Sequence, residues 1–280
     1  MKFVNISGLP RSGSTLLGCL LNQHPDMNVC FDSDLSHIVT SISNDSANVF
    51  NTGQFTIKQY EFLYTDLMRS VIKSWTNNLC KREVYVDKCR GWETDYDLLF
   101  KLIPNAKVIY VMRDLRGVIS SFEKVENYKR ILPTNDSLIP DKDEFNDVDI
   151  MEYRVENYLN DDMISTPLYA LKELQDCRKL YFNNFKFIRY EDYMEKPKEV
   201  LADIYNFIGI KPFDNNLAEI KQGHYNDSCF APYGDHTIRK ELIPQKINSK
   251  FPLLKKEAQE RIIDKCSWFY NTFYPEVTDN

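Results

Sequence analysis

The stretch FVNISGLPRSGSTLLGCLL, residues 3–21, decides the fold of this chain. It begins with a short apolar run, passes through a loop that contains Gly8 and Gly13, and continues into leucines with helical spacing. Strand, glycine-rich loop and helix in this order are typical of a phosphate-binding loop, because loop N–H groups and the helix N-terminus both face an anion. We therefore expect a first strand at residues 3–6 and a first helix at residues 14–22.

Strand and helix patterns alternate along the rest of the chain. Apolar runs predict four more strands, at residues 27–31, 84–86, 107–112 and 185–189. Helical spacing predicts helices at residues 62–79, 95–103, 114–126, 153–182, 197–208 and 254–270. The alternation predicts an α/β protein, with a P-loop-type three-layer α/β/α fold and a mostly parallel central sheet.

Length and composition favour one globular unit. The 280 residues are 43% apolar and 27% charged, which is ordinary for a folded protein. We expect a single domain over residues 1–280. A polar, proline-interrupted segment at about 128–150 is predicted to be an exposed insertion or lid within it.

The charge and the cysteines exclude several classes of function. The net charge of −6 argues against a nucleic-acid partner and weakly against a polyanionic acceptor, although it allows a local basic pocket. The seven cysteines include no C-x-x-C pair, and the four histidines have no ligand spacing, so we expect neither a metal site nor a disulfide framework. We expect no signal peptide and no membrane span, and hence a reducing cytoplasm.

The loop itself supplies the candidate anion ligands. Ser14 stands where a nucleotide triphosphatase has its lysine, and Arg11 is the only cation inside the loop. This arrangement favours a ligand less charged than a triphosphate. The predicted binding residues are Arg11, Ser12, Gly13, Ser14 and Thr15.

A second motif, VMRDLRGVISSF at residues 111–122, follows the most apolar predicted strand. Arg113 at the strand end and Ser121 in the following helix can hold a second phosphate, because the guanidinium makes paired bonds to phosphate oxygens. An isolated Arg-Asp pair would instead indicate a helix cap, with Asp114 capping and Arg113 solvated. Two phosphate motifs in this order favour the binding role.

The segment Pro-Arg-Ser-Gly-Ser-Thr-Leu at residues 10–16 resembles the 5′-phosphosulfate loop of sulfotransferases that use 3′-phosphoadenosine-5′-phosphosulfate (PAPS). It is most similar to the bacterial and tyrosylprotein branches. Arg113 and Ser121 match the family's 3′-phosphate motif. The resemblance implies a PAPS-dependent sulfotransferase that moves a sulfuryl group to an acceptor hydroxyl by in-line displacement, without a metal, and leaves adenosine 3′,5′-diphosphate.

The same resemblance implies roles for further residues. Lys88 matches a lysine that contacts the bridging oxygen of the leaving phosphate, where it offsets developing charge, and Arg90 can assist it. Tyr190, in the segment Arg-Tyr-Glu-Asp, matches a tyrosine near the nucleotide. Arg239, in a late basic loop, is the predicted further phosphate contact. Without these flanking motifs, Lys88 would be read as a surface lysine at a strand exit.

In-line transfer needs a base to take the acceptor proton. Tyrosylprotein enzymes carry a glutamate shortly after the second strand, but this chain has none there. Asp34 is the first candidate for the base, and Asp32 and His37 are the alternatives. A helix-capping role for Asp32 or Ser33 explains the same residues equally well.

Two questions stay open at this point. The acceptor is a hydroxyl-bearing saccharide, lipid, peptide or small molecule, and the sequence does not distinguish them. A P-loop kinase of a small metabolite is the runner-up function, but it would need a lysine after Gly13 and a magnesium site. A non-catalytic relative that binds adenosine 3′,5′-diphosphate is the third reading.

Overall fold

A computed structural model describes residues 1–31, 33–49, 56–124, 147–176, 182–223, 238–247 and 250–278. Its centre is one five-stranded sheet with the strand order β2-β3-β1-β4-β5. The strands are β1 (Lys2–Gly8), β2 (Met27–Phe31), β3 (Val84–Lys88), β4 (Lys107–Met112) and β5 (Phe185–Arg189). All four neighbouring pairs are parallel, so the predicted parallel α/β fold is confirmed.

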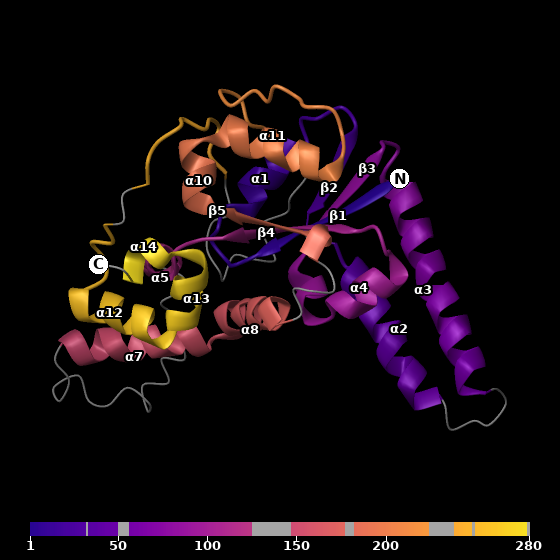
Figure 1. The fold of residues 1–280 in the computed structure, drawn as a ribbon, viewed down its shortest axis with the longest axis horizontal. Helices are drawn as coiled ribbons and strands as arrows, with labels where there is room; N and C mark the ends of the chain where they lie inside the picture. The colour runs from indigo at the N-terminus through magenta and orange to yellow at the C-terminus, as the bar shows by residue number, and fades with distance from the viewer. Residues whose placement is uncertain are drawn as a thin grey trace.

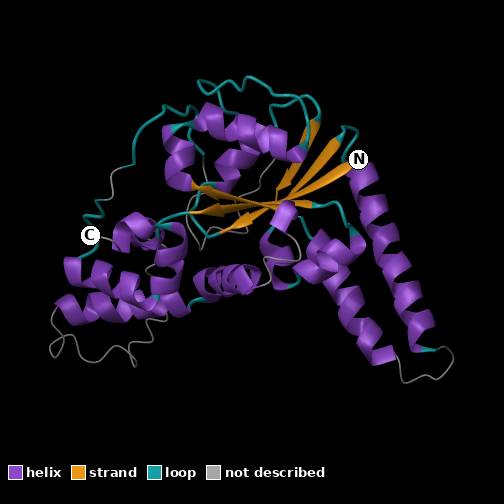
Figure 2. Cartoon of the chain, in the orientation of Figure 1, coloured by secondary structure: helices purple, strands orange, loops and turns teal. Residues whose placement is uncertain are grey.

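Helices cover both faces of the sheet, because successive side chains of a strand point to opposite faces. Val4 and Ile6 of β1 pack with α1 (Ser14–Leu21) and α11 (Pro197–Ile208), whereas Phe3 belongs to the core on the other face. That second core also holds residues of α4 (Tyr96–Leu102), α5 (Leu115–Glu123) and α8 (Asp162–Asp176). Figures 1 and 2 show the resulting three layers.

The remaining helices extend this frame. Their bounds are α2 (Leu35–Val49), α3 (Ile57–Leu79), η2 (Arg90–Thr94), α7 (Asp147–Asn160), η3 (Phe182–Asn184), α10 (Tyr190–Glu195), α12 (Lys256–Lys265), α13 (Ser267–Phe273) and α14 (Pro275–Thr278). Helices α2 and α3 pair with each other and project away from the sheet, whereas α12, α13 and α14 gather near β5 and α5 (Figure 1). Within the described ranges, no helix is both long and apolar enough to cross a bilayer.

The helix predicted at residues 153–182 is two helices that meet at Asp161. The Asp161 carboxylate accepts a hydrogen bond from the backbone N–H of Met163 at 2.8 Å, and its carbonyl accepts one from Ser165 at 2.8 Å. Asp161 therefore ends α7 and starts α8, because a short acidic side chain satisfies N–H groups that a helix start leaves without partners.

Three other expectations differ from the structure or lie outside it. The helix predicted at residues 254–270 is the pair α12 and α13, followed by α14. Helix α2 was not predicted, because its many serine and asparagine residues give a weak helical pattern. Of the insertion predicted at about 128–150, residues 128–146 lie outside the described part, and α7 begins at Asp147.

Candidate functional site

A cavity of about 450 Å³ lies at the carboxyl ends of the strands. Parallel α/β sheets bind ligands at this edge. The cavity brings together most of the residues predicted from the sequence, namely Arg11, Gly13, Ser14, Thr15, Lys88, Arg113, Ser121, Tyr190 and Arg239. The two predicted phosphate motifs therefore share one cavity, as the parallel topology requires.

The phosphate loop turns sharply out of β1. Gly8 has a φ of 131°, and a Cβ atom there would lie 2.1 Å from the backbone oxygen of Val111 in β4. The next residue, Leu9, donates its N–H to that same oxygen at 3.1 Å. Glycine at position 8 is thus required by the close approach of the two strands.

Arg11 adopts a left-handed backbone conformation with a φ of 57°. A residue with a Cβ atom adopts this conformation at a cost of about 1–2 kcal/mol, and such strain concentrates at functional sites. Gly13, with a φ of 84°, ends the loop before α1 begins. A loop that curls through such positive φ angles can turn successive N–H groups toward an anion.

Ser12 sits inside this loop with a buried side chain. Its hydroxyl has no hydrogen-bond partner among the described residues. An unpartnered buried hydroxyl costs about 1–3 kcal/mol, so Ser12 is a candidate donor to a ligand that binds at this loop. Ser12 does not itself line the cavity; it lies one residue from Arg11 and Gly13, which do.

Direct hydrogen bonds join the two phosphate motifs. Arg11 donates from Nε to the Ser121 hydroxyl at 3.2 Å, and Arg113 donates from Nη1 to the Arg11 carbonyl at 2.7 Å. The Arg113 guanidinium also lies over the Tyr190 ring, 4.5 Å from its centre. These contacts fix the Arg113 side chain at the cavity wall before any ligand binds.

Tyr190 forms one wall against the loop. A Cβ atom on Gly13 would lie 2.9 Å from the Tyr190 ring, so the glycine allows the ring to approach the loop backbone. Tyr190 begins α10 directly after β5, and its ring lines the cavity.

Lys88 ends β3, beside Ile6 of β1 and Phe31 of β2 in the sheet register. The buried Asn5 side chain holds this strand end, since its amide donates to the carbonyls of Asp87 at 2.9 Å and Cys89 at 2.8 Å. Two residues further on, Arg90 donates to the backbone oxygen of Met163 in α8 at 3.3 Å. Lys88 and Arg90 thus line the cavity on the β3 side of the phosphate loop.

Sequence reasoning missed Glu93, a buried carboxyl beneath the loop. It accepts hydrogen bonds from the Ser7 hydroxyl and from the Gly8 N–H, the latter at 2.9 Å. Burial raises the pKa of Glu93 to about 7, although these two hydrogen bonds lower it. No local motif marks the residue, since its partners lie more than 80 positions away.

The cavity is strongly basic in an acidic protein. Its described lining includes the cations Arg11, Lys88, Arg90, Arg113, Lys124, Arg239 and Lys250, and no carboxylate. Cations gathered in a hollow attract an anionic ligand despite the net charge of −6. Among the described residues, no cluster of three histidine, cysteine or acidic side chains is arranged to hold a metal ion.

The candidate bases are not part of the described cavity wall. Asp34 is exposed, and its carbonyl accepts a hydrogen bond from Ile38 at 3.0 Å at the start of α2. His37 is also exposed on α2, and Asp32 lies outside the described residues. Ser33 is buried, and its hydroxyl donates to the Asp87 carboxylate.

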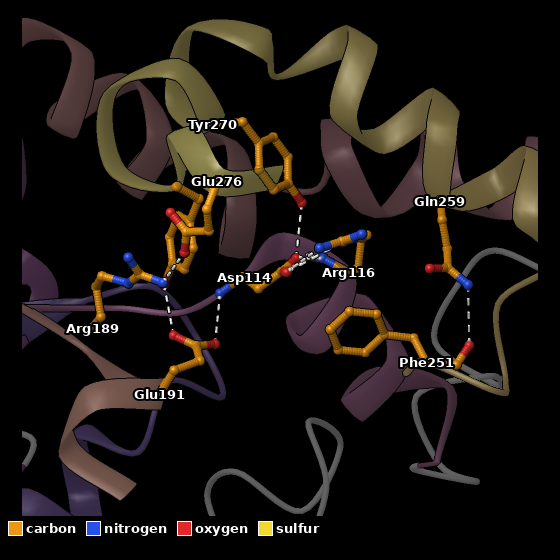
Figure 3. Close-up of polar contacts among 9 residues, drawn as sticks. Asp114, Arg116, Arg189, Glu191, Phe251, Gln259, Tyr270 and Glu276 are labelled. Carbon is orange, nitrogen blue, oxygen red and sulfur yellow. Dashed lines mark hydrogen bonds and ion pairs between the residues drawn. The ribbon is translucent and has the colours of Figure 1, made fainter. Parts of the chain in front are cut away.

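Asp114 caps α5, as the sequence allowed, because its carboxylate accepts from the Arg116 N–H at 2.9 Å. Both carboxylate oxygens also bind the Arg116 guanidinium, and one accepts from the Tyr270 hydroxyl at 3.0 Å (Figure 3). The carboxylate that a kinase would need for magnesium is therefore engaged inside the protein. Capping and binding are not alternatives here, since Arg113 still lines the cavity.

The profile of the sulfotransferase family matches residues 4–215, which is most of the chain. The protein belongs to this family. The matched residues contain the phosphate loop, Lys88, Arg113, Ser121 and Tyr190.

Solved structures agree in fold. The sulfotransferase domain from the curacin biosynthetic pathway is 19% identical with a TM-score of 0.51, over 95% of this chain and 97% of that domain. Sulfotransferase STF9 from Mycobacterium avium is 14% identical with a TM-score of 0.51, over 98% of this chain and 77% of its own. The comparison with curated proteins found no match.

Proposed function

We propose that this protein transfers a sulfuryl group from PAPS to the hydroxyl of an acceptor. The observation that carries the proposal is the hydrogen-bonded chain Ser121–Arg11–Arg113 inside one basic cavity. A protein that binds a single phosphate needs only one of the two motifs. Their convergence supports a nucleotide with phosphate groups at two separate positions.

The residues present fit such a donor. Arg113 and Ser121 would hold the 3′-phosphate, and the loop residues Arg11, Ser12 and Gly13 would hold the 5′-phosphosulfate. The unpartnered Ser12 hydroxyl supports this assignment, because a bound oxyanion would supply its missing acceptor.

Four further side chains complete the proposed donor site. Ser14 and Thr15 add hydroxyl donors at the N-terminus of α1, where the helix dipole favours an anion. Tyr190 would lie against the nucleotide, and Arg239, which also lines the cavity, would add a further phosphate contact.

PAPS supplies an activated sulfuryl group, whose bond to the bridging phosphate oxygen breaks as a bond to the acceptor oxygen forms. Lys88 stands at the end of β3 to offset the negative charge that develops on that bridging oxygen. Arg90, held by Met163, assists from the same side. The acceptor approaches from this β3 side, because the 3′-phosphate anchors occupy the β4 side of the loop.

Asp34 is the proposed base that takes the acceptor proton. Its support is its position three residues beyond β2, the strand beside Lys88. Catalytic hydrogen bonds of enzymes without ligand often close only in the substrate complex. The assignment is tested against Asp32→Asn and His37→Ala, which remove the two alternatives.

The donor site is tested by calorimetric titration with adenosine 3′,5′-diphosphate, run beside ATP with magnesium. We expect the diphosphate to bind, and Arg113→Ala to weaken it about 10- to 100-fold through lost charge-assisted hydrogen bonds. Arg69→Ala is the control, since Arg69 is exposed on α3 and does not line the cavity. It donates to the Lys101 carbonyl at 2.9 Å and lies 4.0 Å from the Asp66 carboxylate. Binding of ATP with magnesium alone would overturn the proposal in favour of a kinase.

Catalysis is tested by supplying PAPS with acceptors of four kinds, namely saccharides, lipids, peptides and small molecules. For the acceptor that turns over, Lys88→Ala should lower kcat about 100-fold while adenosine 3′,5′-diphosphate still binds. Asp34→Asn should lower kcat about 100-fold as well. Diphosphate binding without turnover of any acceptor class would favour a non-catalytic nucleotide-binding protein.

We propose the cytoplasm as the compartment. The five cysteines in the described part of the chain are thiols rather than disulfides, as a reducing compartment favours. Fractionation of the producing cells would test this, and recovery outside the cytoplasmic fraction would contradict it.

A further inference from the structure

Each of two proposed cofactor anchors is followed in the chain by an acidic residue that points away from the cavity. Asp114 follows Arg113 at the end of β4 and is 5% exposed, and Glu191 follows Tyr190 after β5. The backbone N–H of Asp114 donates to Glu191 Oε1 at 3.2 Å. The two strand ends are thus joined behind the cavity by a carboxylate.

The C-terminal helices contact both carboxylates. The Tyr270 hydroxyl donates to Asp114 Oδ1 at 3.0 Å, and the Tyr274 hydroxyl donates to Glu191 Oε2 at 2.9 Å. Figure 3 shows Tyr270 reaching down from its helix to Asp114. Both tyrosine side chains are almost completely buried, at 0% and 1% exposure. Buried hydroxyls placed on carboxylates restrict the carboxylates to one position.

A second connection runs from the same helices to the cavity wall. The Arg116 guanidinium, held by Asp114, lies 5.1 Å from the centre of the Phe251 ring, which lines the cavity. The Phe251 carbonyl accepts a hydrogen bond from the Gln259 side chain of α12 at 3.4 Å (Figure 3). The Gln259 amide also donates to the Leu254 carbonyl at 2.9 Å. The C-terminal segment therefore meets the cavity wall at two independent points.

We propose that Tyr270 and Tyr274 are positioning residues, which hold Arg113 and Tyr190 in their ligand-binding places through Asp114 and Glu191. The inference rests on the proposed donor site. It concerns a segment beyond the family match, which ends at residue 215. A purely structural role is the alternative, because buried tyrosines also stabilise any core.

The two roles differ in which part of the ligand they affect. Arg113 is the proposed contact for the 3′-phosphate. Misplacing it should weaken the binding of adenosine 3′,5′-diphosphate far more than that of adenosine 5′-monophosphate, which lacks that phosphate. A general loss of stability should weaken both ligands equally. The measurement is therefore the dissociation constant of the monophosphate divided by that of the diphosphate, determined by calorimetry or by competition.

Tyr270→Phe should lower the ratio about tenfold, which corresponds to one charge-assisted hydrogen bond. Tyr274→Phe should weaken the binding of both ligands in the wild-type background but cause no further loss in protein that already carries Tyr190→Ala, since it acts through Tyr190. A general loss of stability would weaken the binding of both ligands in either background. Tyr205→Phe is the matched control: Tyr205 is equally buried, bonds Asn215 at 2.7 Å and packs on the opposite face of the sheet. It should leave the ratio unchanged.

A double-variant comparison makes the inference sharper. In protein that already carries Arg113→Ala, Tyr270→Phe should cause no further loss of diphosphate affinity. A further loss as large as in the wild-type background, or a Tyr270→Phe ratio equal to that of Tyr205→Phe, would overturn the inference. Asp114→Ala removes the acceptor of the same hydrogen bond and should reproduce the lowered ratio if Tyr270→Phe does not fold.

Failure of the proposed function gives a different result. Wild-type protein would then bind the diphosphate no better than the monophosphate, and the positioning role would fall with it. Tight, 3′-phosphate-dependent binding by the wild type with unchanged variants would refute only the role of the tyrosines.

Discussion

Replacing Glu93 with glutamine should change how the stability of the protein depends on pH. The pKa of the buried Glu93 carboxyl is about 7, against 4.5 for an ordinary glutamate, mainly because burial disfavours its charged form. At 1.36 kcal/mol per pKa unit, this difference corresponds to about 3 kcal/mol. Below pH 4.5 the carboxyl is protonated in the folded and the unfolded chain, so it causes no pH dependence there.

Between pH 4.5 and 7 the unfolded chain loses the Glu93 proton while the folded protein keeps it. The stability linked to this proton is therefore fully present below pH 4.5, is lost as the pH rises to about 7, and stays constant above it. Glutamine carries no charge at any pH. The free energy of unfolding of Glu93→Gln, relative to wild type, should rise by about 3 kcal/mol from pH 4.5 to pH 7.5.

Urea unfolding at four pH values across this range measures the difference, because every other titrating group is common to both proteins. Glu83→Gln is the control at the other end of β3. The Lys2 ammonium lowers the pKa of Glu83, so the stability linked to this carboxylate is lost only as the pH falls below about 4.5. The difference between Glu83→Gln and wild type should therefore stay nearly constant across this range. Parallel pH profiles for wild type and Glu93→Gln would refute the reasoning, since Glu93 would then titrate as an ordinary glutamate.

Three further outcomes follow from single contacts. Ser12→Ala should raise the melting temperature, because it removes a buried hydroxyl that has no described partner. It should also weaken the binding of adenosine 3′,5′-diphosphate in calorimetry, and an affinity equal to that of wild type would contradict this. Gly8→Ala should lower the free energy of unfolding in urea by several kcal/mol, because the added Cβ would lie 2.1 Å from the Val111 backbone oxygen. Gly209→Ala should lower it by only about 1 kcal/mol, since a Cβ there meets its nearest atom at 3.9 Å. Arg154→Ala should cost about 3 kcal/mol by the same assay, as it leaves the buried Glu123 carboxylate without its 2.6 Å ion pair; a loss below 1 kcal/mol would show the pair to be solvated.

The sequence was informative wherever chemistry is local in the chain. Strand one, the glycine-rich loop and helix one are contiguous, so their order alone predicted a phosphate site at Arg11 and Gly13, and both residues line the cavity. The apolar run at β4 likewise placed Arg113 at the edge of the sheet where parallel strands end. Parallel pairing then brought these motifs together without any further information.

What the sequence did not predict depends on contacts between distant segments. Glu93 matters because it lies beneath Gly8, and no pattern around it reports that neighbour. The break at Asp161 was hidden because a helical pattern continues on both sides, and a capping aspartate also occurs inside helices. For Asp34 the sequence supplied only a position after β2, and the structure leaves that side chain exposed.

The two strand ends explain why adjacent residues in these motifs do different work. At each of these junctions between a strand and a helix, the side chains of two consecutive residues point different ways. Arg113 and Tyr190 line the cavity, whereas Asp114 and Glu191 accept hydrogen bonds from Tyr270 and Tyr274. A cation placed at a ligand site needs a fixed backbone, and a buried carboxylate needs hydrogen-bond donors. We propose that the C-terminal tyrosines supply the hydrogen-bond donors for the carboxylates and thereby fix the backbone that carries the cation. On the proposed positioning role, an acidic residue directly after an anchor belongs to the binding site, although no ligand would contact it.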